Sequence, residues 1–190
     1  MKVKHLVGAF LCVLGCYACS SPKTEVQSPD GHIKMTLTVD ENGKPFYNVS
    51  VDDSLLIENS AMGFTAANGI ILAEGFQVKN TTFSSEDETW TQPWGENKKN
   101  RNHYNEMAVS LTNEDQVQLT LRFRVFDDGI GFRYEYTVPT VDSLLITDEL
   151  TTFRFHRDGT SWSIPASAET YELLYQQQPI SEVETANTPF

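Results

Sequence analysis

Alternating apolar and polar residues constrain the fold of this chain more than any other feature. The alternation runs over ten residues in Val117–Phe126 and over seven in Ile33–Val39, which is the pattern of a strand with one buried and one exposed face. No apolar repeat of helical spacing extends over 11 or more residues. The sequence therefore predicts an all-β domain.

Short turn sequences separate the expected strands. Asn42 and Gly43 supply the positive φ of a tight hairpin, and Phe46–Val51 is the returning strand. Asp127–Gly129 connects the longest alternating segment to a further strand, Ile130–Tyr136. Because such short connections join neighbouring antiparallel strands, we expect an antiparallel, sandwich-like architecture.

One polar segment, Ser84–Arg101, interrupts this pattern and is expected to be a long loop. Loops of more than about 12 to 15 residues are usually functional or disordered. Trp90 and Trp94 argue against disorder, since a buried indole offsets much of the cost of ordering a loop. We expect these indoles to anchor the loop on the sandwich; stacking on a sugar is the second interpretation.

The first 19 residues have the pattern of a bacterial lipoprotein signal peptide. Lys2 and Lys4 precede a short apolar run, and Val13–Cys16 resembles a lipobox in which Cys16 receives the lipid. Cys19 is the competing lipid acceptor, and an ordinary cleaved signal is the alternative. Residues 20–27 are expected to be a polar tether. The predicted location is the periplasm or the outer membrane, as an exported lipoprotein.

The charge of the chain excludes several partners. Fourteen basic and 26 acidic residues give a formal net charge of −12, so a nucleic-acid partner is not expected. A membrane is expected as a partner only through the lipid anchor, because the chain has no polybasic patch. Neutral ligands or cations are favoured instead.

No motif in the folded part predicts catalysis, and no catalytic residue is proposed from the sequence. A Gly-x-Ser-x-Gly motif is absent, and all three cysteines lie within the first 19 residues. The histidines lack metal-ligand spacing; they are His5, His32, His103 and His156. Arg122, Arg124, Arg133 and Glu135 fall on neighbouring expected strands, where cross-strand ion pairing accounts for them.

Four ordered motifs give the chain a resemblance to a known family. They are Ser28–Gly31, Thr89–Glu96, Arg101–Glu106 and Phe126–Glu135. Together they resemble the amino-terminal domain of glycoside hydrolase family 97, which comprises exported α-glucosidases and α-galactosidases. The resemblance covers residues 28–190.

The resemblance implies a β-super-sandwich like that of galactose mutarotase, followed by a (β/α)8 barrel that carries the catalytic carboxylates. It also implies an active-site calcium ion with one ligand from the amino-terminal domain. Glu172, which follows Trp162–Pro165, takes that ligand's place, and Glu169 is the alternative. Asn187–Phe190 resembles the segment that returns toward the barrel.

The chain departs from the family because no barrel follows, and the sandwich itself is expected to be incomplete at its carboxy terminus. We therefore expect a carbohydrate-binding or barrel-supporting domain of a calcium-dependent α-glycosidase, inactive alone, that meets its oligosaccharide substrate through the missing barrel. Tight calcium binding by this chain alone is not expected, since one carboxylate cannot supply about 6 to 8 oxygens. The alternative is a non-catalytic carbohydrate-binding or scaffold lipoprotein.

Overall fold

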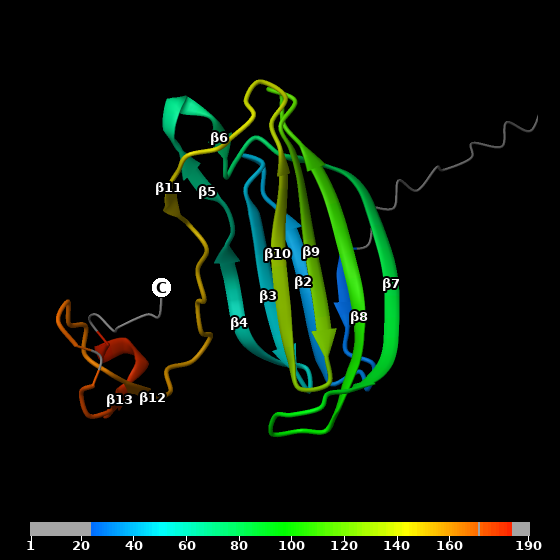
Figure 1. Cartoon of the computed structure of the whole chain (residues 1–190). Helices are drawn as coiled ribbons and strands as arrows, with labels where there is room; N and C mark the ends of the chain where they lie inside the picture. Colours follow the sequence, from blue (N-terminus) through cyan, green and yellow to red (C-terminus); the bar gives the residue numbers. More distant parts are fainter. Residues whose placement is uncertain (1–23, 171, 184–190) are drawn as a thin grey trace, which may run out of the picture.

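Two four-stranded antiparallel sheets lie face to face in the computed structural model, which describes residues 24–170 and 172–183 (Figure 1). The first sheet has the order β1 (Glu25–Gln27), β2 (Ile33–Val39), β3 (Pro45–Val51) and β4 (Ser54–Ala61). The second has the order β10 (Gly129–Thr137), β9 (Gln118–Phe126), β8 (Lys99–Thr112) and β7 (Gln77–Thr91). The predicted all-β antiparallel sandwich is confirmed.

The core between the sheets is built by the two segments with the clearest alternation. Met35 and Leu37 point inward from β2, and Leu119, Leu121 and Phe123 point inward from β9. All five side chains are fully buried. Since burying one such side chain contributes about 1.5 to 3 kcal/mol, this shared layer holds the two sheets together.

A glycine turn locks the β2–β3 hairpin onto the start of β7. Gly43 has φ +74, and a Cβ at this position would lie 2.3 Å from the backbone nitrogen of Phe76. The segment before β7 also donates two backbone hydrogen bonds to the turn, from Phe76 N to Gly43 O at 3.0 Å and from Gly75 N to Asn42 O at 2.9 Å. The predicted turn over Asp40–Gly43 is confirmed, with the positive φ at Gly43 and not at Asn42. It also serves as a contact between the two sheets.

The predicted loop over Ser84–Arg101 is wrong. Strands β7 and β8 continue as a paired ladder as far as Thr91 and Lys99, so only residues 92–98 form a loop. Both faces of the distal hairpin are solvated, and its side chains are therefore polar on both sides. Backbone pairing builds this part of the sheet without the apolar alternation that reveals a half-buried strand.

A smaller set of strands lies at one edge of the sandwich. β11 (Ile146–Glu149), β5 (Phe64–Ala66) and β6 (Ile71–Leu72) form a three-stranded sheet, and η1 (Ala67–Gly69) connects β5 to β6. The segment 150–156 then runs along β4 through backbone hydrogen bonds such as Thr152 N to Ala61 O at 3.0 Å.

The last described elements stand apart from the two main sheets. β12 (Thr160–Ser163) pairs with β13 (Gln176–Pro179), which leads into η2 (Ile180–Glu182). Figure 1 shows this hairpin to one side of the sandwich.

The amino-terminal boundary differs from the prediction in one respect. Glu25–Gln27 forms β1 and pairs with β2, so it is part of the sandwich rather than a tether. The predicted signal peptide with Cys16 and Cys19 lies outside the described residues, as does Asn187–Phe190. Within the described ranges, no helix is long and apolar enough to cross a membrane.

Candidate functional site

A network of ion pairs occupies the outer face of the second sheet. Glu106 on β8 accepts a hydrogen bond from Arg122 Nη1 at 2.5 Å and another from Arg124 Nε at 2.8 Å, both from β9. Glu106 is only 7% exposed. Burial acts to raise the pKa of Glu106, but the hydrogen bonds from Arg124 and Arg122 outweigh it, and the pKa lies below its usual value.

The network continues onto β10. Glu135 accepts from Arg122 Nε at 3.0 Å, from Arg122 Nη2 at 3.2 Å and from Arg133 Nε at 2.7 Å. These hydrogen bonds lower the pKa of Glu135 and raise that of Arg122. The predicted cross-strand ion pairing is confirmed. Each carboxylate is ionised and occupied by guanidinium groups, which suits a structural brace rather than a general acid.

Aromatic rings extend this network toward the β7–β8 hairpin. The guanidinium carbon of Arg124 lies 4.3 Å from the centroid of the Tyr104 ring, within the range of a cation–π contact. Tyr104 also packs against Phe126, with 5.3 Å between ring centroids. The arginine side chain is therefore held by both a carboxylate and an aromatic face.

The tip of the β7–β8 hairpin leaves both of its indoles exposed. Trp94 is 85% exposed and Trp90 is 47% exposed. The prediction that these side chains anchor the segment by burial is wrong. The loop instead closes through its own polar groups, since Gln92 N donates to Lys98 O at 3.1 Å and Gln92 Nε2 donates to Asn97 O at 2.9 Å.

Polar side chains also cluster at the end of the sandwich where β9 turns into β10. Asp127 Oδ1 accepts a hydrogen bond from Asp30 N at 2.9 Å, and Asp127 Oδ2 lies 3.6 Å from His103 Nδ1. Asp127 and Asp128 form the two-residue connection between β9 and β10, so the predicted turn is confirmed. His103 belongs to this turn contact.

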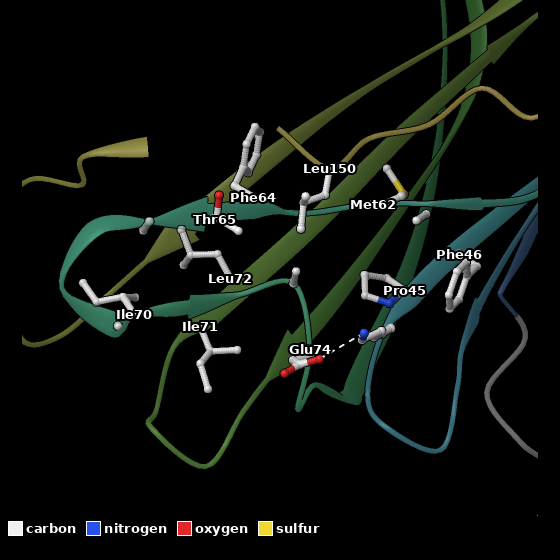
Figure 2. Close-up of a pocket in the computed structure, with 15 residues that line it drawn as sticks. Pro45, Phe46, Met62, Phe64, Thr65, Ile70, Ile71, Leu72, Glu74 and Leu150 are labelled. Atoms are coloured by element: carbon white, nitrogen blue, oxygen red, sulfur yellow. Dashed lines mark ion pairs between the residues drawn. The ribbon is translucent and has the colours of Figure 1, made fainter. Parts of the chain in front are cut away.

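An apolar groove lies between β3, β4 and the β5–β6 hairpin (Figure 2). Its volume is about 420 Å³, and its lining includes Phe46, Met62, Leu72 and Leu150. An ion pair between Lys44 Nζ and Glu74, at 3.1 Å, lies at its edge. Sequence reasoning missed the groove because its lining comes from short strands whose pairing is not evident from periodicity.

The predicted calcium ligand lies between β12 and β13. Glu172 is exposed, and its backbone N–H donates to Thr170 Oγ1 at 3.0 Å; Glu169 is exposed nearby. Over the described part of the chain, no group of three or more His, Cys, Asp or Glu side chains could hold a metal ion. Since calcium takes about 6 to 8 oxygens, Glu172 fits as one ligand but the described residues do not complete a site.

The carboxy-terminal third exposes a series of large apolar side chains. Leu174 is 90% exposed and Trp162 is 65% exposed. We use the name apolar face for the exposed apolar side chains that come from successive segments between residues 145 and 175; they are Leu145, Ile146, Phe153, Phe155, Trp162, Leu173, Leu174 and Tyr175. Large exposed apolar side chains gathered into a patch are typical of a surface that a partner covers.

Comparison with known proteins assigns the chain to a family. The profile of the family described as glycosyl-hydrolase 97 N-terminal matches residues 26–190, nearly all of the described chain. The chain belongs to this family. Its sandwich is thus a glycoside hydrolase family 97 amino-terminal domain, as the four sequence motifs predict.

Relatives of this family 97 domain include enzymes of known activity. A retaining α-galactosidase from Bacteroides thetaiotaomicron is 28% identical over 133 residues, which are 70% of this chain and 19% of that protein. The chain therefore spans about a fifth of the length of this relative.

The chain is also similar to solved structures of family 97 enzymes. A family 97 enzyme from Pseudoalteromonas sp. strain K8, in complex with panose, superimposes with a TM-score of 0.79 at 34% identity, over 87% of this chain and 26% of that one. The same enzyme has been solved with acarbose. A β-arabinopyranosidase superimposes with a TM-score of 0.70 at 25% identity, over 80% of this chain and 26% of that one.

Proposed function

We propose that this chain is the amino-terminal, barrel-supporting domain of an α-glycosidase that hydrolyses α-glucosides or α-galactosides. Family membership over residues 26–190 supports this function, as do relatives that are between three and four times as long as this chain. The catalytic carboxylates would be supplied by the remainder of the enzyme, because the carboxylates of the outer-face network are held in ion pairs.

The apolar face is the observation that carries this proposal. Its side chains are concentrated in one stretch of the chain, from Leu145 to Tyr175. Burying them against a second domain would be favourable by roughly 25 cal/mol per Å² of apolar surface. The proposed partner of this face is therefore the catalytic barrel of the same enzyme.

Calcium is proposed as the cofactor of the complete enzyme, with Glu172 as one of its ligands. The exposed position of Glu172 beside the apolar face would let its carboxylate reach a site shared with the barrel. Further oxygen ligands would come from the barrel. A bound calcium ion would supply positive charge to polarise a substrate oxygen, and Glu172 would help to hold that charge in place.

Export as a lipoprotein is part of the proposal, with Cys16 as the lipid acceptor and the periplasm or outer membrane as the location. Metabolic labelling with radioactive palmitate tests it. The Cys16→Ser variant should lose the label, whereas Cys19→Ser should retain it. Label retained by Cys16→Ser and lost by Cys19→Ser would move the lipid to the second cysteine.

Activity of the native polypeptide tests the proposed reaction. An antiserum raised against this chain would capture the polypeptide from the source cells, and the captured protein would be assayed with p-nitrophenyl α-glucoside and α-galactoside. We expect hydrolysis of one of them, lost in EDTA and restored by Ca²⁺. A captured protein without α-glycosidase activity would instead support the non-catalytic scaffold alternative.

A further inference from the structure

The loop that carries Trp94 is held rigid by contacts within itself. Gly95 has φ +121, and a Cβ at this position would lie 2.5 Å from Gln92 Nε2. That same amide nitrogen donates to Asn97 O, and the Gln92 backbone closes the loop onto Lys98. The polar groups of the loop are thus used to fix its shape, while the indole of Trp94 is left in solvent.

The surroundings of the two hairpin indoles differ from those of the apolar face. Trp90 and Trp94 are flanked by amide and charged side chains, including Gln92, Glu96 and Asn100. Trp90 lies directly opposite Asn100 in the β7–β8 ladder. The apolar face, in contrast, combines aromatic and aliphatic side chains in one series. Isolated indoles among hydrogen-bonding groups suit a ligand that is itself part apolar and part hydroxylated.

The hairpin tip lies at one end of the sandwich. Figure 1 shows its loop at the lower end of the molecule, bent in this view toward the side on which β12 and β13 lie.

The charge of the hairpin narrows the class of ligand. Residues 84–101 contain four acidic side chains and three basic ones, so the hairpin is close to neutral. Indoles could also stack on nucleobases, but a nucleic acid requires a basic groove along its phosphates. A neutral, polyhydroxylated ligand suits both the near-zero charge of the hairpin and its combination of indoles with hydrogen-bonding side chains.

We infer that the tip of the β7–β8 hairpin binds α-linked oligosaccharide, with Trp94 stacking on the apolar face of a sugar ring and Trp90 extending the contact. The choice of α-linked sugars rests on the proposed function. Because the loop is already closed by its own hydrogen bonds, binding has little backbone freedom to remove. Glu96, two residues after Trp94, and Asn100, opposite Trp90 in the ladder, carry groups able to bond to sugar hydroxyls.

Isothermal titration of the full chain with panose and with raffinose tests the inference. We expect a Kd on the order of 1 mM for at least one of the two sugars, as befits one or two stacking contacts. Trp94→Ala should raise this Kd by about tenfold, as expected for a tryptophan anchor. Trp162→Ala removes an indole of similar exposure outside the hairpin and should change the Kd by less than about twofold. Thermal unfolding of each variant would show that the exposed substitutions leave the fold intact.

The inference would be overturned if neither sugar bound at concentrations up to about 20 mM, or if Trp94→Ala bound as tightly as the parent chain. These outcomes can be distinguished from those that would contradict the proposed enzymatic function. An antiserum-captured enzyme that hydrolyses α-glycosides, together with a chain that binds no sugar, would overturn the hairpin site alone. A chain that binds sugar through Trp94, together with a captured protein that lacks activity, would overturn the proposed enzyme and support the hairpin site.

Discussion

Arg124 lies directly opposite Glu106 in the β8–β9 register, and its Nε donates to Glu106 Oε2 at 2.8 Å. The same arginine lies over the Tyr104 ring. These two contacts connect the aromatic end of the outer face to the ion pairs of Arg122 and Glu135. The outer face of the second sheet is thus held by a continuous set of side-chain contacts across three strands.

Removing the central carboxylate should destabilise the sandwich. Glu106→Gln would leave Arg122 and Arg124 without their shared anion, at a cost of about 2 kcal/mol. Urea unfolding measures this change. Glu88→Gln is the matched control, because Glu88 is exposed and its hydrogen bond with Asn102 can be kept by an amide. Equal stability of the two variants would contradict a structural role for Glu106.

Acid should weaken the same network. The pKa values of Glu106 and Glu135 are lowered in the folded state from 4.5. Their contribution is therefore complete above about pH 4.5 and is lost as the pH falls through the lowered pKa values. Urea midpoints measured between about pH 6 and pH 3 should fall steeply for the parent chain. The fall should be shallower for Glu106→Gln, and identical slopes would count against this assignment.

Two glycines with similar backbone angles should respond differently to alanine. Gly43 and Gly31 have φ +74 and φ +80, but only at Gly43 would a Cβ meet the backbone of Gly75 and Phe76. Gly43→Ala should cost about 3 kcal/mol or more, because a backbone must move. Gly31→Ala should cost about 1 kcal/mol, from the positive φ alone. Thermal unfolding compares the two, and equal losses would contradict the close approach.

A buried tyrosine should hold the extended segment that follows β11. Tyr47 is fully buried, and its hydroxyl donates to Thr152 O at 2.9 Å. Burial raises the pKa of Tyr47 to about 12. Tyr47→Phe should cost about 1 kcal/mol and speed amide exchange in residues 150–156. Tyr175→Phe, at an exposed position, should change neither quantity. Unchanged exchange in Tyr47→Phe would show that backbone pairing alone holds this segment.

The sequence predicted the parts of the fold where one side of a strand is buried. The alternation in Val117–Phe126 identified β9. The turn residues around Gly43 identified the β2–β3 hairpin, and those around Asp127 identified the β9–β10 hairpin. The same rule failed for Ser84–Arg101, because a strand solvated on both faces has no apolar alternation to read. The prediction that Trp94 is buried was also wrong. The loop is closed by hydrogen bonds of Gln92, so it does not need the indole to pack against the sandwich.

The resemblance to the family led to two kinds of prediction, the family itself and the role of Glu172, and their outcomes differ. The four motifs identified the family correctly, and they include side chains such as Glu106, Arg133 and Glu135 that build the outer face. Glu172 has no local pattern of its own, because a metal ligand is defined by partners that come together only in the folded enzyme. Its role stays a prediction, and the EDTA-dependent assay above addresses it.

The most direct test of the central claim is hydroxyl-radical footprinting of the apolar face. The reactivity of Phe153, Trp162 and Tyr175 would be compared between this chain and the native polypeptide captured by antiserum. Burial against a catalytic barrel predicts a drop of about fivefold or more at these side chains in the native polypeptide. The exposed Phe83, on the edge strand β7 at the opposite side of the sandwich from β12 and β13, serves as the internal control and should keep its reactivity. Equal reactivity of the apolar face in the two proteins would contradict the account.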